Sequence, residues 1–325
     1  MGLFRYRQVL YAVMAFVLVH GQAGAQPYPM QKPIRLIAPT GAGGSLDTMA
    51  RIIAVNLSKV THQQVIVENM PGAAGMIGAG AVAKAAPDGY TMLAASNGNL
   101  ATTRALFKNV PYDPAKDFAP VSLVAYNPYV LVVNPKLPVK NMADLIRLAK
   151  SKPGEINAAS SGNGSTPHLA LELLNMLAGI KLVHVPYRTS AAGLTSVISG
   201  ETSLMFTGIV SGLPFIENGR LRALGVASDH ALSSLPNTPP IAQTVPGFGA
   251  DNWAGILMPA GTPHAIVQQM HDDIIKVLQM PEVRESFRHQ GLEIAGTTPQ
   301  AFSTFLQSEI KKWTEVIKEA HVRPD

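Results

Sequence analysis

Short β-branched runs alternate with helix-like stretches from residue 26 onward, and Gly, Pro and Asn fill the turns between them. This alternation predicts an α/β fold with mostly parallel sheets covered by helices. The expected strands are 34–38, 65–68, 91–95, 121–124, 129–133, 155–159, 181–185, 203–206, 221–227 and 253–258. The expected helices are 46–60, 75–86, 142–150, 168–178, 191–199, 263–279 and 299–320.

Two places break this alternation. Residues 125–128 alone separate two strand-like runs, and the run 253–258 follows the proline-rich stretch "LPNTPPIAQTVPGFG". We interpret both places as crossings between two lobes, which suits a chain of 325 residues. The first lobe then uses residues 26–125 and 249–325, the second uses 126–248, and a cleft lies between them.

The first 25 residues have the pattern of a secretory signal peptide. Arg5 and Arg7 precede the apolar stretch 9–19, and "AGA" ends at residue 25. A membrane anchor is the alternative, but 11 apolar residues are too few to span a bilayer. Cleavage before Gln26 therefore predicts an exported protein. The chain contains no cysteine, so neither disulfides nor a lipid anchor is expected, and we expect a monomer in a Gram-negative periplasm.

Charge argues against a nucleic-acid partner. Without residues 1–25, which hold two of the 26 basic residues and no acid, 24 basic residues face 21 acidic ones, a net charge of +3. These basic residues are scattered along the chain rather than massed in one segment. An anionic small molecule remains compatible with this balance.

The stretch "GAGGSLD" (41–47) joins the first strand to the first helix. It is not a P-loop, because Lys followed by Ser or Thr is missing, and Leu46 stands where a dinucleotide fingerprint needs Gly or Ala. Glycines can still gather backbone N–H groups at the helix start, which attracts an anion, with Ser45 as the N-cap. Asp47 is expected to tie down loop amides. An ordinary strand-to-helix turn is the alternative.

Three further polar stretches follow expected strands. They are "SSGNGSTPHLALELL" (160–174), with Thr166 as N-cap and Pro167 at the first helical position, "AASNGNLATT" (94–103) and "HVPYRTSAAG" (184–193). Ligands of open α/β sheets bind at the carboxyl ends of strands, so these stretches are expected to meet in the cleft. By contrast, Gly78 and Gly80 mimic part of a dinucleotide motif without its distant acid, and indicate close packing of a helix.

The ordered blocks "GGSLDTMAR", "ENMPGAAGMIG", "PDGYTML", "VPYDPAKDFAPVSLV", "SGNGSTPHLALELL", "HVPYRT", "GRLRALGVAS" and "WAGILMPAGTP" cover essentially the whole mature chain. In them the sequence resembles the Bug-type periplasmic solute receptors of tripartite tricarboxylate transporters. The resemblance implies a type II periplasmic binding-protein fold and delivery of a small organic carboxylate to a two-component permease. It also implies first-lobe contacts from Gly43, Gly44 and Ser45, and second-lobe contacts from Ser161, Gly162, Ser165 and Thr166.

The sequence departs from that family pattern at two positions. Thr40 replaces a usual aromatic residue, and Thr207 stands where an acid or amide is common. Less ring surface and less negative charge would disfavour a ligand ammonium group, so we expect a mono- or dicarboxylate without an amine.

The remaining candidates are weighed against catalytic and metal chemistry. His168 and Glu172 lie four apart, but without a third ligand they favour a hydrogen-bonded pair, and neither a metal nor a cofactor is expected. Arg188 either clamps a carboxylate or pairs with an acid at the lobe surface, and Tyr187 is expected to wall the pocket. The predicted ligand-binding set is Thr40, Gly43, Gly44, Ser45, Asp47, Ser96, Asn97, Ser161, Gly162, Asn163, Ser165, Thr166, Tyr187, Arg188 and Thr207.

Two alternatives to a transport receptor remain open. An exported hydrolase would use Ser45 or Ser161 as its nucleophile, although no Gly-x-Ser-x-Gly elbow and no base at a recognisable spacing accompany either serine. A receptor serving a sensor system is the other alternative.

Overall fold

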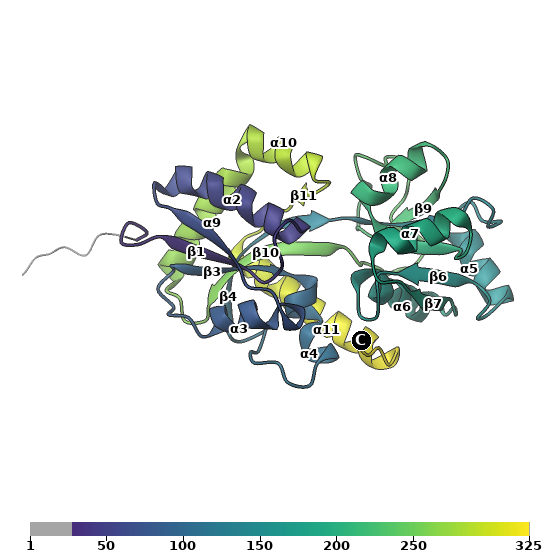
Figure 1. Cartoon of the computed structure of the whole chain (residues 1–325), viewed down its shortest axis with the longest axis horizontal. Helices are drawn as coiled ribbons and strands as arrows, with labels where there is room; N and C mark the ends of the chain where they lie inside the picture. Colours follow the sequence, from purple (N-terminus) through teal and green to yellow (C-terminus); the bar gives the residue numbers. More distant parts are fainter. Residues whose placement is uncertain (1–27, 325) are drawn as a thin grey trace, which may run out of the picture.

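The computed structural model describes residues 28–324, which form two α/β lobes lying side by side (Figure 1). The expected signal peptide, residues 1–25, lies outside the described residues. None of the helices within residues 28–324 is long and apolar enough to cross a bilayer.

The first lobe contains a six-stranded sheet in the order β11-β4-β10-β3-β1-β2. Its strands are β1 (Ile34–Ala38), β2 (Val65–Asn69), β3 (Thr91–Ser96), β4 (Phe118–Asn127), β10 (Asn252–Pro259) and β11 (Glu293–Ile294). Its helical segments are α2 (Ser45–Thr61), η1 (Ala73–Gly75), α3 (Met76–Ala83), η2 (Asn97–Ala101), α4 (Thr103–Leu106), α9 (His264–Gln279), α10 (Pro281–His289) and α11 (Pro299–Glu319).

The second lobe contains a five-stranded sheet in the order β7-β6-β8-β5-β9. Its strands are β5 (Tyr129–Val133), β6 (Asn157–Ser160), β7 (Val183–Pro186), β8 (Leu204–Gly208) and β9 (Arg222–Val226). Its helical segments are α5 (Met142–Ser151), α6 (Thr166–Ala178), α7 (Ser190–Ser199), α8 (Ile209–Glu217) and η3 (Ile241–Gln243).

Both sheets are mixed, so the expectation of mostly parallel sheets is wrong. Within residues 28–324, β1 pairs in parallel with β2 and β3, and β6 pairs in parallel with β7 and β8. The pairs made by β10, β11 and β5 are antiparallel. The reason lies in the crossings, because β5 and β10 are the strands with which the chain enters each lobe from the other one.

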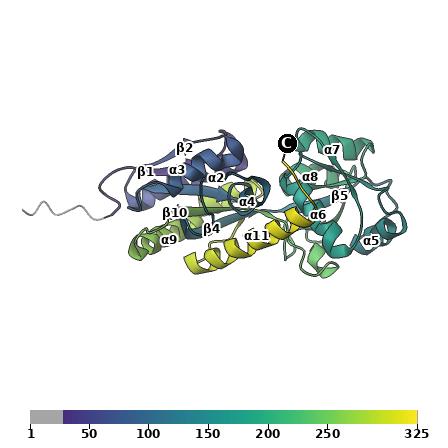
Figure 2. The ribbon, with the colours of Figure 1, turned by 90° about the horizontal axis from the view of Figure 1, so that it is seen from below.

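The chain crosses between the sheets twice. Pro128 alone separates β4 from β5, and a long segment leads from β9 back to β10. The C-terminal helix α11 also runs from the first lobe toward the second, where it contacts α6 (Figure 2).

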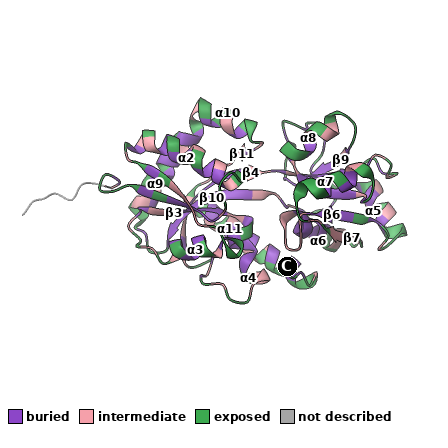
Figure 3. Cartoon of the chain, in the orientation of Figure 1, coloured by how far each residue is buried: buried purple, intermediate pink, exposed green. Residues whose placement is uncertain are grey.

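Apolar stripes hold each lobe together. On α2, Met49, Ala50, Ile53 and Leu57 are fully buried against the first sheet, as the helical spacing predicts, whereas Leu46 is only half-buried. Figure 3 shows buried strands at the centre of each lobe and exposed helix faces outside. The strand ends that carry polar loops therefore lie at lobe edges, where the two lobes face each other.

Candidate functional site

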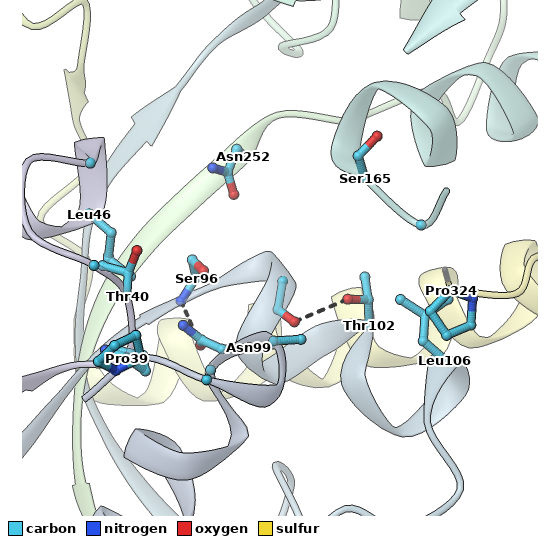
Figure 4. Close-up of a pocket in the computed structure, with 18 of the residues that line it drawn as sticks. Pro39, Thr40, Leu46, Ser96, Asn99, Thr102, Leu106, Ser165, Asn252 and Pro324 are labelled. Carbon is cyan, nitrogen blue, oxygen red and sulfur yellow. Dashed lines mark hydrogen bonds between the residues drawn. The ribbon is translucent and has the colours of Figure 1, made fainter. Parts of the chain in front are cut away.

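A cavity of about 630 Å³ lies between the lobes, at the ends of β1, β3 and β6. Figure 4 shows Thr40 and Leu46 at one end, Leu106 and Pro324 at the other, and Ser165 across from both. Its lining comprises Pro39, Thr40, Gly41, Gly44, Ser45, Leu46, Pro71, Gly72, Ala74, Gly75, Ser96, Gly98, Asn99, Thr102, Leu106, Phe107, Asn163, Gly164, Ser165, Asn252 and Pro324. None of these lining residues carries a charged side chain.

The start of α2 provides unpaired backbone donors at this cavity. Gly43 has φ +85°, a left-handed conformation that favours glycine, and the chain then enters α2 through Gly44. The expected N-cap was Ser45, but the N-cap is Gly44 and Ser45 is the first helical residue. Within residues 28–324 no group accepts a hydrogen bond from the amides of Ser45 and Leu46.

Asp47 organises the loop from beneath, as the sequence predicts. Its carboxylate accepts hydrogen bonds from the Gly43 amide (2.8 Å), Arg51 Nε (3.0 Å) and Asn69 Nδ2 (2.8 Å). Burial raises the pKa of Asp47, but these three bonds outweigh it and hold the pKa below its ordinary value. Asp47 and Gly43 do not line the cavity, so Asp47 acts on its shape rather than on a ligand.

The segment after β3 contributes the predicted Ser96 together with Asn99 and Thr102, which the predicted set does not contain. A π-helical turn, η2, is joined to Ser96 by a hydrogen bond from the Ser96 amide to Asn99 Oδ1 (3.0 Å). This turn places Ser96, Asn99 and Thr102 on the cavity. Asn97 is buried instead and does not line the cavity. Its side-chain atoms Nδ2 and Oδ1 have no hydrogen-bond partner within residues 28–324.

The second lobe presents the loop before α6. Ser165 Oγ donates to Gly162 O (2.7 Å), and the Gly164 amide donates to His168 Nδ1 (3.0 Å). Asn163, Gly164 and Ser165 line the cavity, whereas the predicted Ser161, Gly162 and Thr166 do not. The expected N-cap Thr166 is corrected to Ser165, one residue earlier, with Pro167 in the first turn.

A serine and a histidine side chain, Ser160 and His184, lie close together away from the cavity surface. Ser160 Oγ lies 2.5 Å from His184 Nε2, but Ser160 is fully buried beneath the loop. Ser45 and Ser161, the nucleophiles of the hydrolase alternative, make no side-chain hydrogen bond to a histidine within residues 28–324. No described group of three or more His, Asp or Glu side chains is placed to hold a metal ion.

Three other predicted residues lie away from the cavity. Tyr187 packs against the second lobe's core and Arg188 is exposed, and neither lines the cavity. Arg188 forms no ion pair within residues 28–324, so the predicted pairing with an acid at the lobe surface is not present there. Thr207 is buried inside β8, which runs on to Gly208 rather than ending at residue 206. Its position therefore gives no support to the argument about a ligand amine.

Of the predicted set, the structure brings Thr40, Gly44, Ser45, Ser96, Asn163 and Ser165 to one cavity. Asn252 at the start of β10 joins them from a crossing segment. Sequence reasoning missed Asn99, Thr102 and Asn252, although the first two lie in the polar stretch 94–103 that it did single out.

The family model of the tripartite tricarboxylate transporter family receptor matches residues 49–322. The chain belongs to this receptor family. Protein BugT of Bordetella pertussis is 34% identical to this receptor over 321 residues, which cover 98% of each chain.

Solved structures agree with this assignment. The structure of Rpa4515 from R. palustris with adipate is 34% identical, has a TM-score of 0.73, and matches 92% of this receptor and 100% of that chain. MatC (Rpa3494) from Rhodopseudomonas palustris with bound malate is 29% identical with a TM-score of 0.69, covering 89% and 100%. The expected two-lobed periplasmic binding-protein fold is therefore confirmed.

Proposed function

We propose that the protein captures a small organic carboxylate in the periplasm and delivers it to a tripartite tricarboxylate-type permease, without catalysing a reaction. The observation that carries this proposal is an interlobe cavity whose lining is uncharged, with the unpaired amides of α2 at one end. Family membership and relatives solved with adipate and malate support the ligand class.

Backbone dipoles replace water around the ligand's negative end in this proposal. The amides of Ser45 and Leu46 point along the helix axis at the positive end of the α2 dipole, which stabilises an anion. Ser96, Asn99 and Asn252 offer neutral polar groups from the same lobe. Closure of the lobes brings Asn163 and Ser165 onto the other side of the ligand and excludes solvent.

The export signal and the lobe boundaries belong to the same proposal. Residues 1–25 direct the chain to the periplasm and are removed before Gln26, which N-terminal sequencing of the exported protein tests. Lobes comprising 26–125 with 249–325, and 126–248, explain how two crossings form a hinge.

Two substitutions at Ser45 separate the amide from the hydroxyl. Ser45→Ala removes only the hydroxyl, whereas Ser45→Pro also removes the N–H. Proline suits the first helical position, and Gly44 has φ −75° and ψ 164°, which a following proline allows. A hydrogen bond to a charged acceptor contributes about 1.5–3 kcal/mol, so we expect Ser45→Pro to bind roughly 10–100-fold more weakly than Ser45→Ala.

The ligand for this comparison comes from a thermal-shift screen of mono- and dicarboxylates, aromatic acids and amino acids, since a bound ligand raises Tm by mass action. Titration calorimetry then measures Kd for the two variants and the wild type. Equal affinity of Ser45→Pro and Ser45→Ala would contradict the proposal that the Ser45 amide binds the carboxylate. Turnover of an ester panel that Ser45→Ala abolishes would instead favour the hydrolase.

A further inference from the structure

The end of the interlobe cavity farthest from Thr40 and Leu46 is made by two separate parts of the chain. Leu106 is the last residue of α4 and Pro324 follows α11, and the two side chains lie next to each other there (Figure 4). Together with Phe107, they also line a second hollow of about 710 Å³. These three residues therefore form an end wall between the cavity of about 630 Å³ and further open space.

The α4 side of this end wall is fixed by the preceding turn. The Leu106 amide donates a hydrogen bond to Thr102 O (3.1 Å). The Phe107 amide donates to Thr103 O (2.9 Å). Thr103 is fully buried, and its Oγ1 donates to Gly98 O (3.1 Å). Leu106 therefore cannot move without disturbing the segment after β3.

A left-handed turn at the end of α11 brings the other side of the end wall to the cavity. His321 has φ +52°, and its amide donates to Lys318 O (3.2 Å). The Val322 amide donates to Ile317 O (3.0 Å), and both of these apolar side chains are buried in the first lobe's core. The two hydrogen bonds form a Schellman motif, which ends the helix and redirects the chain. Pro324, two residues later, lines the cavity.

Beyond this turn, packing alone holds the part of the chain end that the structure describes. Arg323 and Pro324 form no hydrogen bond and no ion pair within residues 28–324. Arg323 is exposed and Pro324 is half-buried, whereas Val322 before them is buried. Pro324 therefore closes the cavity without supporting the core, and we expect a chain shortened after Arg323 to keep its fold.

The second lobe contacts the same end of the cavity. A Cβ added at Gly164 would come 3.2 Å from Leu106 Cδ1, so the loop before α6 packs against Leu106. A change at Leu106 or Gly164 would thus alter the contact between the lobes. Pro324 is the member of the end wall that can be changed without disturbing either α4 or this contact.

We propose that Pro324, carried by the turn after α11, is a specificity-determining residue that sets the upper size limit of the ligand. This inference rests on the proposed function and concerns the residue that limits ligand size, whichever acid is bound. A ligand that ends before Pro324 does not contact it, whereas a longer one meets its ring. Without Pro324, the cavity opens into the second hollow.

The test uses straight-chain monocarboxylates from acetate to decanoate. Calorimetry measures Kd for the wild type, for a chain ending at Arg323 and for Pro324→Gly. A chain ending at Pro324 is the matched control, because it is shortened but keeps the proline ring. Arg323→Gln is a second control, because Arg323 lines only the second hollow. Circular dichroism melting of each unliganded variant checks folding.

Affinity in the wild type should rise about fourfold for each added methylene that is buried, and should fall once the acid meets Pro324. The chain ending at Arg323 and Pro324→Gly should move this optimum to a longer acid. For the first acid beyond the wild-type optimum, both variants should bind at least ~10-fold more tightly than the wild type, because they relieve overpacking. Shorter acids should bind all proteins equally, and both controls should keep the wild-type optimum.

Three results would overturn the inference while leaving the receptor function in place. They are an unchanged optimum in both variants, an affinity of the wild type that rises up to decanoate, and an equal loss of affinity for every acid, which would mean that Pro324 only excludes solvent. A wild type that binds none of these acids also overturns the size limit. The carboxylate-receptor function itself fails only if the thermal-shift screen finds no acid either.

Discussion

At the residue scale, the cavity depends on side chains that do not touch it. Asp47 is buried and joins the Gly43 amide, Arg51 and Asn69, and Asn69 Nδ2 also donates to Thr40 O (3.1 Å). One carboxylate therefore fixes both ends of the loop that presents the α2 amides. Its position in the first turn of a helix after a glycine-rich loop made this role predictable.

Asp47→Asn tests that role. The asparagine side chain has the size of the carboxylate but no charge. Its NH₂ group would also face one of the three groups that donate hydrogen bonds to Asp47. We expect a loss of about 2–3 kcal/mol in unfolding free energy at pH 7 and at least ~10-fold weaker ligand binding. Because folding depresses the pKa of Asp47, its contribution is present above the unfolded-state pKa of about 4 and is lost at lower pH.

Urea titrations of the wild type and Asp47→Asn at pH 7 and pH 3 measure this. The stability difference should shrink at pH 3, because there the unfolded chain, whose Asp pKa is about 4, takes up a proton that the folded state binds less readily. A difference of equal size at both pH values would mean that packing rather than charge is responsible.

Other residues show where sequence reasoning stops. Proximity to the carboxyl end of a strand correctly brought Ser96 and Asn163 to the cavity. The same argument failed for Tyr187 and Thr207, because it identifies an edge of the sheet but not the direction in which a side chain leaves it. The same argument could not identify Asn252, which lies at the start of a strand, because only the crossing of the chain between the lobes brings β10 to the cleft.

At the element scale, apolar periodicity located every expected strand and helix within about two to three residues, which is the usual uncertainty of helix and strand ends. Besides the short helical segments η1, η2, α4 and η3, three elements were missed. β11 has only two residues and no periodic signal, and α8 contains Pro214, which argues against a helix. α10 follows α9 after Met280 alone, although Pro281 at its first position was a usable signal. Strand direction was not predictable from alternation.

Helix α3 confirms the close packing expected of its glycines. A Cβ at Gly78 would lie 2.9 Å from Met70 O and 2.9 Å from Pro39 Cβ. Gly78→Ala must therefore shift backbone next to the cavity, and we expect a loss of roughly 1–3 kcal/mol in unfolding free energy by urea titration, as for other overpacked sites. Pro39 lines the cavity, so ligand affinity should fall as well.

Gly80→Ala on the same helix is the control. Its Cβ would meet the Pro111 side chain at 3.2 Å rather than backbone, and alanine gains about 1 kcal/mol of helix propensity over glycine. We expect Gly80→Ala to stay within about 1 kcal/mol of the wild type. Equal losses in both variants would show that α3 tolerates no side chain at either glycine, rather than that Gly78 marks a specific contact.

At the scale of the whole molecule, a titratable group ties together the two crossings between the lobes. Asp251 Oδ1, just before β10, accepts the hydrogen bond of the Tyr129 amide at the start of β5 (3.0 Å). A small hollow of about 130 Å³ surrounds this link, with Tyr126, Asp229, His230, Glu309 and Lys312 among its lining residues. His230 Nε2 lies 2.9 Å from Glu293 Oε2, a second link between the segment after β9 and the first lobe.

Asp251 should make stability depend on pH near neutrality. Burial, with a smaller effect of the Glu293 and Asp229 charges, raises the pKa of Asp251 to about 7, although the Tyr129 hydrogen bond and His230 oppose this. The folded state thus holds this proton more tightly than the unfolded state, whose Asp pKa is about 4. The contribution of Asp251 to stability is therefore greatest below a pH of about 4. It falls as the pH rises from about 4 to about 7, and it stays reduced at higher pH.

Asp251→Asn keeps an oxygen acceptor for Tyr129 and removes the buried charge, so its unfolding free energy should exceed that of the wild type by roughly 1–2 kcal/mol at pH 8 and by less at pH 5. Asp88→Asn is the contrasting control. Burial raises the pKa of Asp88, but Lys32 and the Tyr90 amide outweigh it and lower that pKa, so this variant should lose stability at pH 8. If urea titrations from pH 5 to 8 give parallel curves for the wild type and Asp251→Asn, Asp251 stays ionised throughout, and the crossings are joined by a charge-independent hydrogen bond.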